Sequence, residues 1–88
     1  MILETPYEMA AEAAKRFRKL RKTKKMTIKE LSKRSGVPYS TVRRFESTGQ
    51  ISFVSLVKLT STLDEDHQIH ELFSVAVPQS IEEVVRGL

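Results

Sequence analysis

Side chains able to bind phosphate groups and base edges gather in the first half of this chain. Thirteen of its fifteen Lys and Arg residues lie between Lys15 and Arg44, and this stretch holds one acid, Glu30. The stretch therefore has a net charge of +12, against −3 for residues 1–14 and −5 for residues 45–88. Solvated helix faces are the alternative interpretation. The density of charge favours a polyanion partner, because each phosphate that Lys or Arg neutralises releases counterions.

Catalytic and metal-binding chemistry finds little support in the sequence. The chain has no cysteine, which excludes disulfides, thiol nucleophiles and thiolate metal sites. His67 and His70 lie three residues apart beside Glu71, but no further ligand stands near them in the sequence. The serines of the basic stretch have no adjacent general base. We therefore expect no enzyme, no cofactor and no metal.

Length and hydropathy define the class of protein. A chain of 88 residues suits a single domain with a marginal core, for which dimerisation would provide additional burial. The longest apolar run, Val75–Val77, is far shorter than the ~20 residues that span a bilayer. Residues 1–7 lack the features of a secretion signal. The sequence predicts a cytoplasmic protein without a membrane partner.

Apolar periodicity and capping residues predict an all-α fold of five helices. Thr5 and Thr27 are each followed three residues later by Glu, the signature of a capping box, and Gly36 suits a helix end. The five helices are expected at Pro6 to about Thr23, Thr27–Gly36, Tyr39–Ser47, Ser52–Leu63 and His67–Phe73.

The last residues differ in character from the helical part. Val75–Val77 is typical of a short β segment that Pro78 ends, and residues 80–83 are able to cap one final turn. The chain is therefore divided into a domain of residues 1–74 and an extension of residues 75–88. The extension is assigned to dimerisation or partner contact.

The second and third helices have the arrangement of a helix-turn-helix. Gly36 between them permits a tight turn, and the apolar Val37 after it fills the gap between the helices. Pro38 prevents the second helix from running straight on. In this motif the second helix projects its first residues into the major groove, while the first helix lies against the DNA backbone.

Residues 26–46, MTIKELSKRSGVPYSTVRRFE, resemble the Cro/C1-type (XRE) DNA-binding family, whose pattern is Leu-Thr-Gln-x-Glu-Leu-Ala-x-x-x-Gly-Val-Ser-x-x-Thr-Ile-x-x-x-Glu. With the flanking helices the resemblance covers about residues 10–73. It implies a five-helix Cro/C1-repressor-like domain that binds double-stranded DNA as a sequence-specific transcriptional repressor.

The resemblance also implies roles for individual residues. Those expected to contact base edges are Tyr39, Ser40, Thr41 and Arg44. For Thr41 a phosphate contact is equally usual, and for Tyr39 packing against Pro38 and a sugar is the alternative to a base contact. Arg44 suits guanine, whose O6 and N7 atoms accept both arms of a guanidinium.

Phosphate contacts are expected from a second set of residues. Arg43 is expected to bind a phosphate from the side of the recognition helix, and Thr27 to offer its hydroxyl and helix-start N–H groups. The other members of this set are Lys24, Lys25, Lys29 and Gln50. For Arg16, Lys19 and Arg21 a flanking phosphate, a partner and solvent all remain open.

The chain departs from the family pattern at three places. Ile28 replaces the usual Gln, so the phosphate contact of that Gln is missing or moved. Pro38 replaces the usual Ser or Thr, which leaves the third helix without a hydroxyl cap unless Ser40 serves. The segment Ser47–Gly49 is one residue longer than the commonest form, which puts the phosphate contacts of the following loop in doubt.

In length, helix order and the β-like segment after the fifth helix, the chain is similar to the HipB antitoxins of toxin–antitoxin operons. This resemblance implies a homodimer on an inverted-repeat operator that represses its own operon and binds a HipA-like serine/threonine kinase toxin. A phage-type or orphan regulator without a toxin partner is one alternative. No small-molecule ligand is expected, because the chain holds no ligand-sensing domain.

Two further binding functions are weighed against duplex DNA. A protein-interaction module with non-specific DNA affinity would use Phe53, Val54 and Val75–Val77 as its surface. RNA is disfavoured because the four phenylalanines, at positions 17, 45, 53 and 73, follow core periods rather than form a stacking platform.

Overall fold

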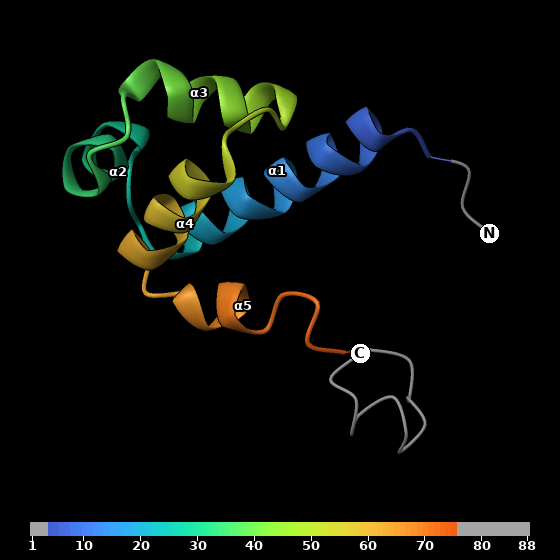
Figure 1. Cartoon of the computed structure of the whole chain (residues 1–88). Coiled ribbons are helices and arrows are strands. Elements are labelled where there is room, and N and C mark those ends of the chain that lie inside the picture. The colour runs from blue at the N-terminus through green and yellow to red at the C-terminus, as the bar shows by residue number, and fades with distance from the viewer. Residues whose placement is uncertain (1–3, 76–88) are drawn as a thin grey trace.

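The structure is a computed structural model that describes residues 4–75. This part of the chain contains five helices and no strand, which confirms the predicted all-α fold. The helices are α1 (Pro6–Thr23), α2 (Ile28–Ser35), α3 (Tyr39–Thr48), α4 (Phe53–Thr62) and α5 (Asp66–His70). Figure 1 shows α3 at the top of the molecule and α5 at the bottom, with α1 and α4 between them.

Hydrogen bonds at the helix starts explain where the first two helices begin. The Thr5 hydroxyl accepts the backbone N–H of Glu8 at 3.1 Å, and the Glu8 carboxylate accepts the N–H of Thr5 at 3.2 Å. Thr27 and Glu30 repeat the same reciprocal pair at the start of α2. Both predicted capping boxes are confirmed. Each satisfies two N–H groups that a helix start otherwise leaves unpaired.

The core forms where α1, α2, α3 and α4 meet. Its centre is an edge-to-face pair of aromatic rings, Phe17 of α1 and Phe45 of α3, with centroids 5.1 Å apart. Each large apolar side chain buried in this way stabilises the fold by ~1.5–3 kcal/mol. The other buried apolar residues are Ala14, Leu31, Val37, Val42, Leu59 and Leu63.

The end of α3 crosses the start of α1 at very short range. Gly49 ends α3 in a left-handed conformation with φ of +83°. A Cβ atom at this position would lie 2.5 Å from the carbonyl carbon of Ala10 and 2.7 Å from the backbone nitrogen of Ala11. The crossing therefore requires glycine for two independent reasons, the backbone angle and the absence of a side chain.

Two sequence predictions about the second half of the chain were wrong. The fifth helix ends at His70 rather than Phe73, because the chain turns there and Phe73 takes a left-handed φ of +61°. Phe73, expected at a core period, is 88% exposed; Phe53, for which the core and an exposed interaction surface were both open, is 54% exposed. Phe53 is the first residue of α4 and Phe73 follows the end of α5. Of the β segment expected at Val75–Val77, only Val75 lies within the described residues.

Candidate nucleic-acid interface

The connection between α2 and α3 is a fixed turn rather than a loose loop. Gly36, with φ of +78°, donates its N–H to the carbonyl of Ser32 at 3.0 Å. The Ser32 hydroxyl donates to the carbonyl of Val37 at 2.7 Å, and the Val37 N–H donates to the Ser35 hydroxyl at 3.1 Å. Val37 is 2% exposed. The glycine turn and its apolar plug are as predicted, and together they set the angle between the two helices.

Helix α3 has one buried face and one free face. Val42 and Phe45 point into the core, whereas Tyr39, Ser40 and Arg44 are exposed and Thr41 is half-buried. The predicted base-contacting residues thus share the part of α3 that is open to solvent. The arrangement follows from the 3.6-residue period, because Val42 and Phe45 recur on one side of the helix.

No side chain caps the start of α3. Pro38 occupies the cap position, and its carbonyl accepts the N–H groups of Thr41 and Val42 at 3.0 and 3.1 Å. Ser40 does not act as the cap, because α3 begins one residue before it. The first N–H groups of a helix have no partner within the helix, so those of Tyr39 and Ser40 remain available to an external acceptor.

Arg44 and Gln50 are joined directly. An Nη atom of Arg44 donates to the amide oxygen of Gln50 at 2.7 Å. Thr48 completes the arrangement: its hydroxyl donates to the carbonyl of Arg44 at 2.7 Å and accepts the N–H of Gln50 at 3.1 Å. Arg44, expected to contact a base, and Gln50, expected to contact a phosphate, are therefore held side by side. The Gln50 amide keeps its two N–H donors, and the guanidinium of Arg44 is positioned before any ligand binds.

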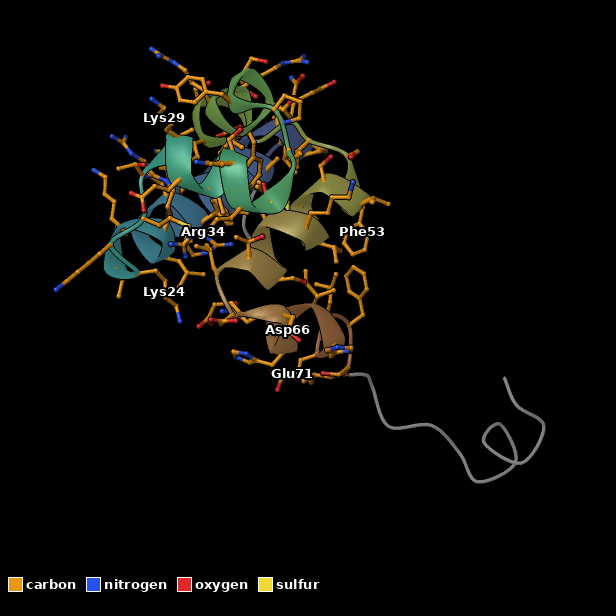
Figure 2. All side chains as sticks on the ribbon, turned by 90° about the vertical axis from the view of Figure 1, so that its left-hand side faces the viewer. Lys24, Lys29, Arg34, Phe53, Asp66 and Glu71 are labelled. Carbon is orange, nitrogen blue, oxygen red and sulfur yellow. The ribbon has the colours of Figure 1, made fainter. Side chains whose placement is uncertain are left out.

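At the start of α2, the Thr27 hydroxyl is already engaged. Besides accepting the Glu30 N–H, it donates to the Glu30 carboxylate at 3.1 Å. The Glu30 carboxylate also accepts the N–H of Thr27 at 3.3 Å, so the polar groups of Thr27 are already paired within the helix start. Ile28 and Lys29 are the first two residues of α2, and they precede Glu30, whose N–H group Thr27 accepts. The exposed Lys29 adds a positive charge in the same turn. Figure 2 shows Lys29 at the end of the molecule that holds α3.

Lys24 lies elsewhere. Its ammonium group is 2.9 Å from a carboxylate oxygen of Glu65, just before α5. The hydrogen bonds that Glu65 accepts from Lys24 and Gln68 hold the pKa of its carboxyl below the usual value. In Figure 2 Lys24 lies toward the acidic end that holds Asp66 and Glu71. Lys25 occupies the turn between α1 and α2 with a left-handed φ of +57°. A phosphate contact by Lys24 therefore competes with an internal ion pair.

Arg21 is a structural residue, and none of the three roles left open for it applies. Its Nε and Nη2 atoms donate to the two carboxylate oxygens of Glu46 at 2.7 and 2.8 Å. Its Nη1 atom donates to the carbonyl of Met26 at 2.9 Å. The two side chains are 8% and 5% exposed. The hydrogen bond to Glu46 raises the pKa of Arg21, while burial acts in the opposite direction.

The remaining positive charge lies at the surface. Of the thirteen bases between Lys15 and Arg44, the other twelve are exposed. Arg18 of α1 and Arg43 of α3 line a hollow of about 320 Å³ above the buried ion pair, together with Ser47. Because both cations face one hollow, the basic surface of α3 continues onto α1. The sequence pattern alone did not indicate that Arg18 lies on the same surface as Arg43.

Within residues 4–75, no three His, Cys, Asp or Glu side chains are grouped so as to hold a metal ion. His67 instead lies 3.8 Å from Glu65, and His70 lies 4.0 Å from Asp66.

None of the helices in the described part of the chain is both long enough and apolar enough to cross a membrane.

Comparison with known proteins gives one family match. Residues 17–69, well over half of the chain, match a family described as Helix-turn-helix. The matched stretch includes the Arg21–Glu46 ion pair, the α2–α3 turn and the exposed face of α3. No curated protein and no solved structure gives a significant match.

Proposed function

The chain belongs to the helix-turn-helix family of DNA-binding transcription regulators, and on this premise we propose that it is a sequence-specific repressor. The observation that supports this most is the division of α3 into a buried face, with Val42 and Phe45, and a free face with Tyr39, Ser40 and Arg44. A helix anchored in this way presents side chains to the major groove without moving its backbone.

In the proposed complex, Arg44 reads guanine through its guanidinium, a contact worth ~1–3 kcal/mol of discrimination between bases. Its hydrogen bond to Gln50 limits the rotamers available to it, so less side-chain entropy is lost on binding. Ser40, Thr41 and Tyr39 contact neighbouring base edges from the first turn of α3. Tyr39 is 47% exposed, so its ring is able to reach the groove.

Phosphate contacts are proposed at three positions around the recognition helix. Lys29 and Lys25, with the first N–H groups of α2, bind one strand, and the Gln50 amide binds the other side of the groove. Arg43 and Arg18 bind a third position through the hollow between α1 and α3. These contacts set the orientation and most of the salt-dependent affinity, while the α3 residues supply the sequence preference. Thr27 contributes backbone N–H groups near it rather than its hydroxyl.

We further propose that the repressor acts as a homodimer on an inverted repeat. Two recognition helices would enter successive major grooves, whose centres lie ~34 Å apart along the duplex. Bound across a promoter, the dimer would block transcription. The resemblance to HipB antitoxins supports a finer proposal, in which the promoter is that of its own operon and a HipA-like kinase toxin is the partner.

A second candidate is a protein-interaction module with non-specific affinity for DNA. The exposed Phe53 and Val54 at the start of α4 favour it, because they present apolar surface to a partner. This candidate and the antitoxin assignment share a test, since a cognate kinase encoded by a neighbouring gene would co-purify with the chain. An orphan regulator would bind its operator without such a partner.

The deciding experiment selects bound duplexes from a random pool and then titrates the enriched sequence at several salt concentrations. A repressor of this kind enriches an inverted repeat that it binds ~10³-fold or more tightly than random duplex. Enrichment of a single half-site would retain the base contacts and contradict the dimer. Weak binding with a steep salt dependence and no preferred sequence would contradict the repressor, and would favour the interaction module instead.

A further inference from the structure

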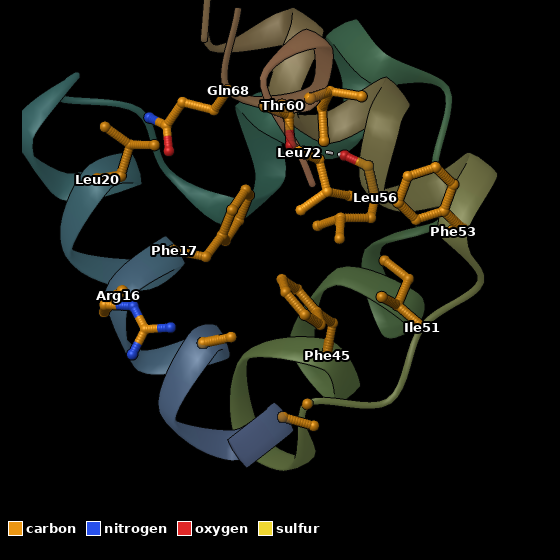
Figure 3. Close-up of a pocket in the computed structure, with 14 residues that line it drawn as sticks. Arg16, Phe17, Leu20, Phe45, Ile51, Phe53, Leu56, Thr60, Gln68 and Leu72 are labelled. Carbon is orange, nitrogen blue, oxygen red and sulfur yellow. Dashed lines mark hydrogen bonds between the residues drawn. The ribbon is translucent and has the colours of Figure 1, made fainter. Parts of the chain in front are cut away.

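An apolar groove of about 600 Å³ runs along one side of the molecule, between α1, α4 and α5. Figure 3 shows Phe17 and Phe45, the central ring pair of the core, at its base. Its lining includes both Gly49, which ends α3, and Leu72, which follows α5. The groove therefore extends between the α3 end and the α5 end of the molecule that Figure 1 shows.

The rim of the groove is apolar as well. Phe53 and Leu72, both among the lining residues, are 54% and 43% exposed within the described part of the chain. The residues next to them, Val54 and Phe73, are 65% and 88% exposed. Apolar surface that is continuous around a groove is rare in a soluble monomer and marks an interaction site.

Phe73 is held in this exposed position by a defined turn. The N–H of Ser74 donates to the carbonyl of Glu71 at 2.9 Å, which closes the chain around it. Its backbone has a left-handed φ of +61°, a conformation that costs a residue with a side chain ~1–2 kcal/mol. Neither the strain nor the exposure of the ring is explained by contacts within one copy. Strain of this kind is typical of sites that contact a ligand or partner.

We propose that the groove is the interface of the homodimer, and that each copy inserts Phe73 into the groove of the other. The inference rests on the proposed function, because it assigns an interface to the dimer proposed there. A two-fold interface uses the same patch on both copies, so that patch must supply both the projecting group and the cavity that receives it. Phe73 and the groove meet this requirement, since Leu72 joins them directly.

The exposed apolar area fits what a stable dimer needs. A full aromatic side chain buries ~150–250 Å², so Phe53 and Phe73 together offer roughly 200–350 Å² in each copy. A specific interface buries ~800 Å² per partner, a little more than half of it apolar. The two rings therefore provide roughly half or more of that apolar part. Val54, Leu72 and the walls of the groove provide the remainder.

The charges around the groove complement each other across such a pair. Arg16 lines the α1 wall and is exposed, and the exposed Glu71 lies two residues before Phe73. When Phe73 enters the partner's groove, Glu71 approaches the partner's Arg16. An ion pair at the rim adds little affinity, but it disfavours other alignments of the two copies. This pairing assigns Arg16 to a partner, one of the three roles that its sequence position left open.

The interface leaves the recognition helix free. From α3 itself, the groove takes Phe45 of the buried face, whereas Tyr39, Ser40 and Arg44 lie on the free face. Because the groove runs between the α3 and α5 ends, a two-fold axis along that direction keeps both recognition helices at one end of the dimer. This is the arrangement that two successive major grooves require.

Because the chain has no cysteine, single introduced cysteines report contacts between copies. A full chain with Ala13→Cys, on the α1 wall of the groove, is mixed with one carrying Ser74→Cys, next to Phe73. In the control mixture Lys15→Cys, exposed on the opposite side of α1, replaces Ala13→Cys. Under mild oxidation we expect the mixed disulfide at several times the yield of the control. Equal yields in the two mixtures would overturn the proposal.

Sedimentation equilibrium provides a second test. Phe73→Ser should lower the association constant of the full chain ~10-fold or more, because a central aromatic anchor is among the costliest interface residues to lose. Phe73→Leu keeps an apolar side chain and should retain most of the association. Unchanged association in Phe73→Ser, or a parent chain that is monomeric throughout, would overturn the proposal. The second result would assign the groove to another occupant.

Neither test uses DNA, so the failure of this inference and the failure of the proposed function are distinguishable. An inverted repeat that is enriched while cross-linking fails would retain the dimeric repressor and reject only this interface. Cross-linking that succeeds while no sequence is preferred would retain the interface and reject the repressor.

Discussion

Arg21 and Glu46 tie α1 to the recognition helix through two parallel hydrogen bonds, of 2.7 and 2.8 Å, across 25 residues of sequence. The pair is buried next to the central aromatic rings, one residue from Phe45. A forked contact between two planar groups fixes both distance and rotation. The position of α3 relative to α1 is therefore set by a polar contact as well as by the core.

We expect Glu46→Gln to cost about 3–5 kcal/mol of unfolding free energy, because it leaves the charge of Arg21 buried without its partner. Urea unfolding of the variant measures this cost. The double variant Arg21→Met/Glu46→Leu is the control, since it removes both charges and should recover much of the loss. A loss below 1 kcal/mol in Glu46→Gln would mean that water or another acceptor reaches Arg21.

Gly49 and Gly36 should respond differently to alanine. Both have positive φ, which costs a non-glycine residue ~1–2 kcal/mol. A Cβ at Gly36 meets no atom within 4 Å, whereas one at Gly49 meets the backbone of Ala10. Thermal unfolding should therefore show a clearly larger loss for Gly49→Ala than for Gly36→Ala. Equal losses would contradict the close crossing of α3 over α1.

Arg44→Ala should weaken binding to the selected operator by about 1–3 kcal/mol and relax the preference at one base pair. Gln50→Ala should have a smaller effect in the same direction, because it removes the acceptor that positions Arg44. Competition binding against single-base variants of the operator distinguishes a loss of affinity from a loss of base preference in each variant. If Arg44→Ala bound the operator as tightly as the parent chain, the assignment of α3 residues to base edges would be wrong.

Lys29→Ala should weaken binding to every duplex alike and reduce the slope of log K against log salt by about 1, as expected for one lost phosphate contact. The matched control is Lys58→Ala, which removes an exposed lysine from α4, outside the basic stretch. Titrations on operator and random duplex at several salt concentrations provide the measurement. A sequence-dependent loss in Lys29→Ala would assign it to a base contact instead.

Acid should destabilise the fold partly through Glu65. Its folded-state pKa lies below the usual 4.5, so the unfolded state binds more protons in this range, and stability falls as the pH drops through the lowered pKa. Above pH 4.5 the contribution is complete. Glu65→Gln removes this titration. Its Tm should therefore fall by less between pH 6 and pH 3 than the Tm of the parent chain. An equal loss in both would show that the ion pair with Lys24 does not contribute.

The features that were predictable from sequence are local ones. Helix starts at Thr5 and Thr27 follow from residues three positions apart, and the turn at Gly36 follows from its backbone freedom. The exposed face of α3 follows from the spacing of Val42 and Phe45. Each of these depends on interactions within about one helical turn, which the chain encodes directly.

The features that were missed depend on pairs distant in sequence. Arg21 falls on the same stripe of α1 as Ala14 and Phe17, which was a signal that its side chain points inward. Its partner Glu46 is not deducible from that stripe, because the crossing of α1 and α3 decides which acid it meets. Phe53 and Phe73 follow apolar periods, but periodicity does not tell whether another element covers them.

The separation of Lys29 at one end of the molecule from the acids around α5 has a kinetic consequence. Residues 64–71 hold four acids and no Lys or Arg, while α2 and the first part of α3 lie within the basic stretch. In the field of a polyanion, such a molecule experiences a torque that turns its α3 end forward before contact. At 0.1 M salt this torque acts only within ~10 Å of the polyanion. Fewer collisions are then wasted on the wrong face, so the charge asymmetry raises the rate of productive encounter more than the lifetime of the complex.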